Sequence, residues 1–125
     1  MNRHETREVA MSVLYQSLLL DKDIKRVLIE NNDVGNDISP FLYTLTIDAF
    51  HNKLAYIDNI NKHLKKDWSF DRLGYIEQAI FIVACAELDF ETAQRSVVIN
   101  EAIALAKKYC DEDVYRLVNG VLDKL

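Results

Sequence analysis

The clearest hydrophobic pattern in the chain lies between residues 97 and 125, where apolar positions recur at helical spacing. In the first half they follow the i, i+3, i+4, i+7 repeat that lines one face of a helix. These positions are Ile99, Ala102, Ile103, Ala106 and Tyr109. Ser96 is a candidate N-cap, and Lys107 and Lys108 occupy the last turn, where positive charge favours the helix dipole. The pattern predicts a helix that ends near Cys110.

A second helix is predicted directly after it. Asp111 has the side chain of an N-cap, and Glu112 and Asp113 are first-turn acids. The apolar stripe consists of Val114, Leu117, Val118, Val121, Leu122 and Leu125. Asn119-Gly120 alone indicates a hairpin turn, but the stripe continues through it. We therefore expect Gly120 inside a helix, where it allows the close approach of a backbone or a ligand.

A third helix is predicted over residues 73–90, and its central run, residues 79–86, is apolar on every side. A helix of this kind must be buried by several neighbours, so we expect it at the centre of the fold, with Asp71 as its N-cap. Glu77 and Glu87 are its polar exceptions. The expected core residues in and before it are Trp68, Leu73, Ile76, Ile80, Val83 and Leu88.

The first half of the chain also shows helical patterns. One helix is expected over residues 3–20 and a short one over 23–30, before the loop sequence NNDVGND. Ser39 and Pro40 then match the N-cap and first residue of a long helix that continues to about residue 66, with a break in its apolar stripe at 52–53. Cations cluster at its end, where we expect a structural role with the helix dipole. They are Lys62, His63, Lys65 and Lys66.

Composition supports an all-α fold in one domain over residues 1–125. Half of the residues are hydrophobic, and only three glycines and one proline occur. The net charge of −5 argues against indiscriminate binding to nucleic acid, which requires many cations, but it allows a small local basic site.

Candidate catalytic chemistry is sparse. Cys85 lies in an apolar run and Cys110 at a helix end, so they predict neither a disulfide framework nor a metal site. The three histidines are scattered, and no phosphate-binding glycine loop occurs. We expect a protein that is not an enzyme and needs no cofactor or metal. The polar N-terminus, and apolar runs far below the roughly 18 residues of a membrane span, predict a cytoplasmic protein without membrane contact.

The start of the first helix carries a small group of cations. Arg3, His4 and Arg7 are near neighbours on a helix, although Glu5 and Glu8 weaken the positive charge. A solvated helix start is one interpretation, and a nucleic-acid contact is the other.

The C-terminal sequence INEAIALAKKY, followed by an acidic corner and VNGVLDKL, resembles the C-terminal motif of the NusB family. The first helix, with Val13-Leu14-Tyr15, is also similar. Three departures concern Cys110, Leu117 and Ile82, where family members usually have glycine, phenylalanine and arginine. The resemblance implies about six helices in two small bundles that share the buried central helix.

The resemblance also implies a function, transcription antitermination. Such proteins bind boxA single-stranded RNA together with the ribosomal protein NusE, and RNA polymerase then reads through terminators, notably on rRNA operons. The RNA-binding residues implied in this chain are Arg3, His4, Arg7, Tyr15, Glu77, Lys108, Asp113, Arg116 and Asn119. One alternative is a protein-interaction module that binds NusE or another basic partner without appreciable RNA binding. Another is a detached RNA-binding domain of an rRNA methyltransferase.

Overall fold

The computed structural model describes residues 1–35 and 38–125, and part of the expected loop, residues 36–37, lies outside the described residues. Every regular element in this described part is helical, as predicted. Helix α1 spans Arg3–Leu20. Its N-cap Asn2 accepts a hydrogen bond from the Glu5 amide (2.7 Å), and the Glu5 carboxylate accepts one from the Asn2 amide (3.1 Å). This reciprocal pair satisfies amides that a helix start otherwise leaves free.

Helix α2 spans Ile24–Glu30, close to the predicted 23–30, and Asp23 is its N-cap. The expected long third helix is broken into pieces. These are α3 (Pro40–Tyr43), a π-helical turn (Thr44–Asp48), α4 (Ala49–His51) and α5 (Lys53–Asn61). Ser39 caps α3, as predicted, through a hydrogen bond from the Leu42 amide (3.1 Å). The break at Asn52 matches the interruption in the apolar stripe, but the helix ends at Asn61 and leaves the lysine cluster in a loop.

Helix α6 spans Tyr75–Phe90 and starts later than predicted. Asp71 does not cap it, because residues Phe70–Arg72 form a separate 3₁₀ turn. The N-cap is Gly74, whose amide donates to the carboxylate of Glu77 (2.8 Å). The side chain that stabilises the start of α6 is therefore Glu77, whereas the sequence predicted Asp71.

Helix α7 spans Arg95–Tyr109, and helix α8 spans Glu112–Leu122. Ser96 lies inside α7 rather than at its cap, which is Gln94. Asp111 caps α8 as predicted, through a hydrogen bond from the Val114 amide (3.1 Å).

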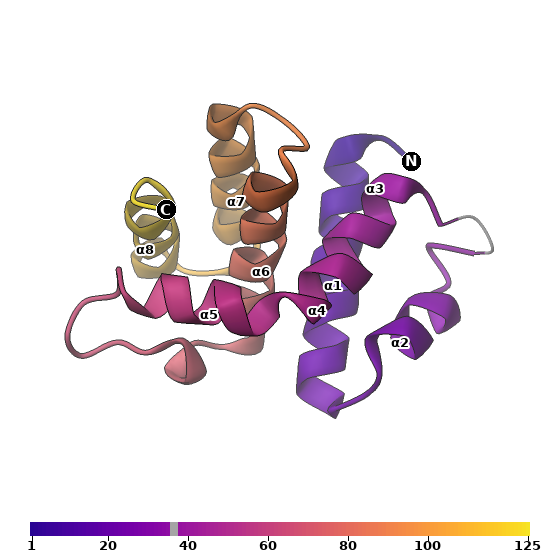
Figure 1. Cartoon of the computed structure of the whole chain (residues 1–125), viewed down its shortest axis with the longest axis horizontal. Coiled ribbons are helices and arrows are strands. Elements are labelled where there is room, and N and C mark those ends of the chain that lie inside the picture. Colours follow the sequence, from indigo (N-terminus) through magenta and orange to yellow (C-terminus); the bar gives the residue numbers. More distant parts are fainter. Residues whose placement is uncertain (36–37) are drawn as a thin grey trace.

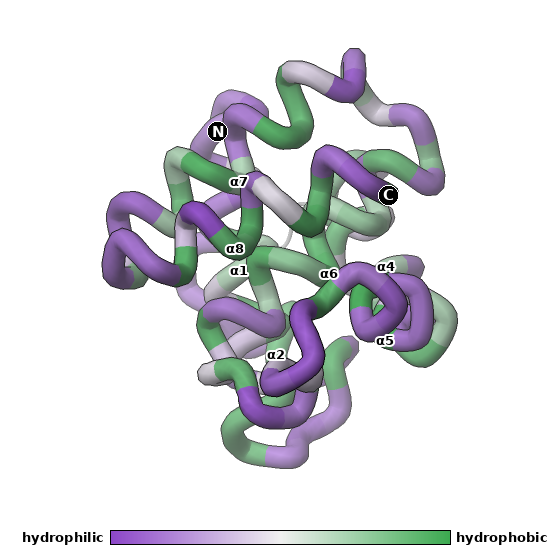
Figure 2. Tube along the Cα trace, turned by 90° about the vertical axis from the view of Figure 1, so that its left-hand side faces the viewer, coloured by the Kyte–Doolittle hydropathy of each residue, from purple (hydrophilic) through white to green (hydrophobic). Residues whose placement is uncertain are grey.

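Helix α6 is the central element, as its all-round apolar sequence predicted (Figure 1). Residues 78–87 are all buried. Helix α1 and the π–α4 segment pack on one side of α6 and α7 on the other, with α5 and α8 also in contact with it. Figure 2 shows hydrophobic segments of the trace gathered around α6 and hydrophilic segments on the outside. The predicted pair of bundles that share one helix is thus confirmed.

Two expected core residues lie at the surface. Trp68 is 43% exposed, because it belongs to the loop between α5 and α6 instead of a helix. Tyr109 is also exposed, and its hydroxyl donates to Glu8 on α1. Helical periodicity places a residue on a face, but it does not determine whether a neighbouring element covers that residue.

Candidate nucleic-acid interface

The seam between α1 and α7 holds the first group of candidate residues. Arg3 is exposed, donates to the carbonyl oxygen of Thr92 (2.7 Å), and lies over the ring of Phe41 (4.2 Å to its centroid). His4 pairs across the seam with Glu101 on α7 (2.7 Å). These contacts position the start of α1 and leave the side chains of Arg3 and His4 exposed to solvent.

Lys108 lies further along the same seam. Its ammonium group is 2.6 Å from the carboxylate of Glu8, to which the Tyr109 hydroxyl also donates. Hydrogen bonds from Lys108 and then Tyr109 lower the pKa of Glu8 below its usual range. Glu8 therefore stays ionised at neutral pH and partly neutralises the Lys108 cation.

Arg7 differs from the prediction that it belongs to an exposed basic patch. Only 4% of it is exposed, and its guanidinium makes two hydrogen bonds of 2.8 Å to the carboxylate of Glu87 on α6. The Thr92 hydroxyl donates to the same carboxylate (2.7 Å). The hydrogen bond to Glu87 raises the pKa of Arg7. A side chain enclosed in this way is not available to a phosphate, so Arg7 supports the position of α1.

Tyr15 and Glu77 are half-buried. Tyr15 packs against the hydrophobic core from α1, while Glu77 holds the start of α6. Burial raises the pKa of the Cys110 thiol to about 11, with smaller contributions from the charges of Glu77 and Asp111. The start of α6 therefore lies beside the corner between α7 and α8.

The three candidates on α8 lie on two different surfaces. Asp113 and Arg116 line a hollow between α8 and the loop before α6, and Arg116 also pairs with Glu112. Asn119 lines a separate hollow with Ser96 and Asn100 of α7. The nine candidate residues thus do not form one site, and Arg7 is not on the surface.

The loop residues that line the hollow beside Asp113 and Arg116 were not predicted from the sequence as site residues. Trp68, His63 and Lys65 line it, although Trp68 was expected in the core and the cations were assigned to a helix end. The available signal was an aromatic residue that closely follows four cations, a composition typical of single-stranded nucleic-acid sites.

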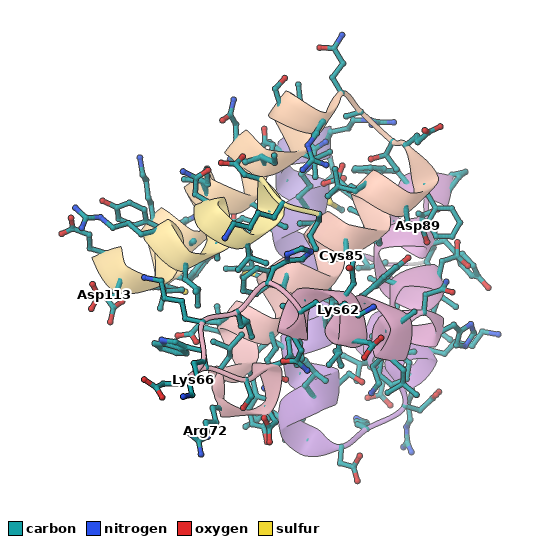
Figure 3. The ribbon with its side chains drawn as sticks, turned by 60° about the vertical axis from the view of Figure 1, so that its left-hand side comes forward. Lys62, Lys66, Arg72, Cys85, Asp89 and Asp113 are labelled. Carbon is teal, nitrogen blue, oxygen red and sulfur yellow. The ribbon has the colours of Figure 1, made fainter. Side chains whose placement is uncertain are left out.

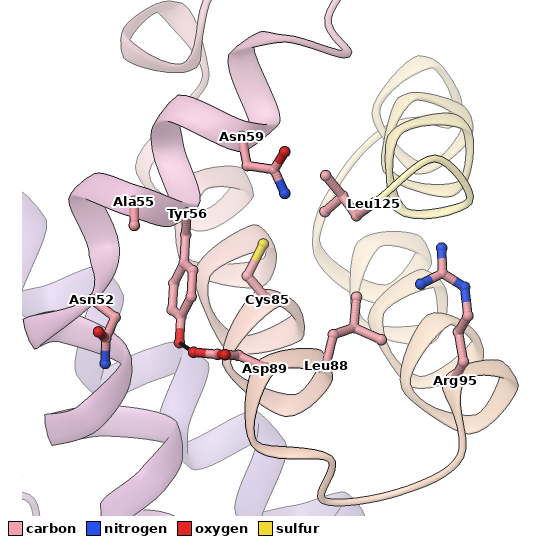
Figure 4. A pocket seen from close by; sticks show the side chains of 9 residues that line it. All are labelled: Asn52, Ala55, Tyr56, Asn59, Cys85, Leu88, Asp89, Arg95 and Leu125. Atoms are coloured by element: carbon pink, nitrogen blue, oxygen red, sulfur yellow. Dashed lines mark hydrogen bonds between the residues drawn. The ribbon is translucent and has the colours of Figure 1, made fainter.

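A further hollow, of about 450 Å³, lies between α5 and the end of α6 (Figure 4). The Tyr56 hydroxyl donates to Asp89 (2.6 Å) at its edge, and Cys85 lies at its base. Burial raises the pKa of the Cys85 thiol to about 12 and also raises the pKa of Tyr56. Neither group is ionised near neutral pH, so neither has the activation of a nucleophile.

Comparison with known proteins decides the family. The model of the NusB family matches residues 4–125, almost the whole chain. The chain belongs to the NusB family. A protein named transcription antitermination protein NusB, from Bacillus cereus strain B4264, is 36% identical over 127 residues, which cover 100% of this chain and 97% of that relative.

Solved structures of NusB proteins share the fold. NusB from T. maritima has a TM-score of 0.77 at 28% identity, with 99% of this chain and 89% of that chain covered. The NusB in a structure of antitermination factors NusB and NusE in complex with dsRNA has a TM-score of 0.76 at 31% identity, with 99% and 96% covered. Among the described residues of this NusB-family chain, no helix is long and apolar enough to cross a membrane.

Proposed function

We propose that this chain is a transcription antitermination factor that binds boxA-type single-stranded RNA together with NusE and supports read-through by RNA polymerase, notably on rRNA operons. The observation that carries the RNA-binding step is the exposure of cations on the α1–α7 seam and on α8. The side chain of Arg116 is 70% exposed, that of Lys108 60% and that of His4 59%. Although the protein is acidic overall, these exposed cations provide local surfaces that can bind phosphates.

The ion pairs of these cations do not prevent RNA binding. Exposed pairs contribute at most about 1 kcal/mol, because water screens them. A phosphate can therefore replace the carboxylate of Glu8 beside Lys108, or that of Glu112 beside Arg116. The same carboxylates repel an RNA backbone as a whole, so binding by this chain alone is weak.

NusE supplies the remaining affinity. If the partner contributes further phosphate contacts, RNA binding by the pair is tighter than by either protein, and RNA tightens the protein pair by the same factor. The action is binding without catalysis, in the cytoplasm, with no cofactor. Residues 1–125 act as one domain, since both sets of helices pack on α6.

A titration of fluorescently labelled boxA RNA, followed by anisotropy with and without NusE, tests the proposal. We expect weak binding alone, tighter binding with NusE, and a loss of RNA affinity in the double variant Lys108→Ala, Arg116→Ala. Arg7 is unsuitable for this test because its replacement disturbs a buried pair. Lys25→Ala, an exposed cation on α2, is the control. The titration is repeated with double-stranded RNA, because the similar structure of NusB and NusE contains dsRNA.

A protein-interaction module is the second candidate, and one observation favours it. Three of the candidate cations, Arg7 included, lie within 4 Å of a carboxylate, and so does His4. If the wild-type protein binds NusE but neither form of RNA at low salt, this second function replaces the first. Equal RNA affinity of the wild type and the double variant removes the two cations from the site.

A further inference from the structure

The hollow between α8 and the loop that joins α5 to α6 has the properties of a ligand site. Its volume is about 530 Å³, within the usual range for a small-molecule site. Trp68, His63 and Lys65 line it from the loop, Arg116 from α8, and Lys124 from the turn that follows α8. Figure 3 shows Asp113 of α8 and Lys66 and Arg72 of the loop region along this same edge of the molecule.

The loop is held in place without covering Trp68. The Trp68 amide donates to the carbonyl oxygen of Lys65 in a tight turn (2.8 Å). Immediately after it, Phe70 is buried, and its amide donates to the side chain of Asn61 (2.9 Å). The Gln78 amide group donates to the carbonyl oxygens of Phe70 and Leu73 (3.2 and 3.0 Å). A large aromatic ring that remains 43% exposed on an anchored loop is a preorganised stacking surface.

The charges around Trp68 differ from those on the α1–α7 seam. The lining of the hollow contains one acidic residue, Asp113, and four basic ones. These are His63, Lys65, Arg116 and Lys124. Among the described residues, Lys65 and Lys124 have no carboxylate within ion-pair distance, whereas Lys108 and His4 each have one. An anion in the hollow can therefore contact Lys65 and Lys124 without displacing a carboxylate from them.

The wall that α8 contributes is open and partly apolar. It consists of Leu117, Gly120 and Val121. A Cβ atom built on Gly120 meets nothing within 4 Å, so no other backbone approaches this glycine, and of the two expected neighbours, a backbone or a ligand, the first is ruled out. The missing side chain instead leaves room in the hollow for a flat group that enters from solvent.

We propose that this hollow is a nucleotide subsite on the RNA path: one unstacked base lies on Trp68, and the flanking phosphates contact Lys65 and Lys124. The inference rests on the proposed function, because it extends the same single-stranded RNA beyond Asp113 and Arg116. An exposed aromatic ring in the same hollow as two unpaired lysines fits a base and its phosphates, since every base has a face that stacks and every linkage has a negative charge.

Trp68 is the only tryptophan in the chain, so its emission reports directly on the subsite. We expect unlabelled boxA RNA to quench this emission with the same midpoint that anisotropy gives for labelled RNA. Trp68→Ala should weaken RNA binding about tenfold, the loss typical of one stacked base, while Trp68→Phe should retain most of the affinity. Lys65→Ala and Lys124→Ala should each weaken binding, and Lys25→Ala should not. Far-ultraviolet circular dichroism confirms that each variant is folded.

Three outcomes overturn the inference, and they differ in what they say of the proposed function. If labelled RNA binds but Trp68 emission and the Trp68→Ala affinity are unchanged, the subsite is wrong and RNA binding stands. If neither readout detects RNA with or without NusE, both proposals fail. If the emission changes on addition of NusE alone, measured against the Trp68→Phe protein as background, the hollow belongs to the protein partner.

Discussion

Arg7 illustrates how a charged residue on an amphipathic helix can belong to the interior. Its pair with Glu87 joins α1 to α6, and the Thr92 hydroxyl ties the turn after α6 to the same carboxylate. The ring of Phe41 lies 5.4 Å from the Arg7 guanidinium and 4.2 Å from that of Arg3. The buried arginine thereby fixes the helix from which Arg3 and His4 reach solvent.

Replacement of Arg7 by alanine should destabilise the protein by about 3–5 kcal/mol, because it leaves the Glu87 carboxylate buried without its partner. Replacement of the exposed Arg3 should cost less, about 1 kcal/mol, because water can replace its hydrogen bond to Thr92 and its contact with the Phe41 ring lies at the surface. Urea unfolding of the two variants measures both values. Equal stability of Arg7→Ala and the wild type would show that the pair is not buried in solution.

The two cysteines should react slowly and in a defined order. Burial raises the pKa of Cys110 to about 11 and that of Cys85 to about 12, so the reactive thiolate is a small fraction of either at pH 7. Iodoacetamide should modify Cys110 first, and its rate should still increase with pH above pH 9. A rate for Cys110 that levels off below pH 9, measured by mass spectrometry, would contradict the raised pKa.

At the scale of the element, α8 combines a buried stripe with an open face. Val114, Val118, Val121 and Leu122 are buried, while Gly120 lies on the exposed side. Glycine in a helix interior costs up to about 1 kcal/mol relative to alanine through the entropy of the unfolded chain. Nothing near Gly120 requires its small size for packing.

The substitution Gly120→Ala should therefore stabilise the protein by about 0.5–1 kcal/mol, since the new methyl group contacts no other part of the described structure. Urea unfolding and the thermal midpoint measure the gain. Val121→Ala is the opposite control, because it removes buried atoms from the neighbouring position and should destabilise. A loss of stability in Gly120→Ala would indicate that α8 packs more closely than described.

At the scale of the whole molecule, the candidate RNA-binding cations are few and lie on separate surfaces of an acidic protein. The seam of α1 and α7 presents Arg3 and Lys108, and the Trp68 hollow presents Lys65, Arg116 and Lys124. An RNA strand that follows both surfaces meets only a small number of phosphate contacts. The dependence of affinity on salt reports that number directly.

The logarithm of RNA affinity should fall against the logarithm of salt concentration with a slope of about −2 to −3 for the isolated protein, as expected for about four phosphate contacts on a single strand. Lys65→Ala should make the slope shallower by about 0.7, and NusE should make it steeper. Anisotropy titrations at four salt concentrations provide these slopes. An unchanged slope in Lys65→Ala would remove this lysine from the phosphate contacts.

Local chemistry was enough to predict several elements from the sequence alone. Asp111 and Ser39 cap the helices that follow them, as predicted, because a cap depends only on residues two or three positions away. The all-round apolar run from 79 to 86 identified α6 as the central helix for a similar reason, since it can be buried only by neighbours on every side. The family motif in α7 and α8 could be recognised for the same reason, since it consists of residues that are close together in the sequence.

Only the tertiary structure decided which polar side chains reach solvent. Arg7 meets a carboxylate 80 positions away, and helical spacing contains no information about that partner. Trp68 lies outside the core because α5 ends at Asn61 and the chain then turns along α8, which brings Lys65 and Arg116 to one hollow. Periodicity determines the face on which a residue lies, whereas burial and pairing depend on which distant element packs against that face.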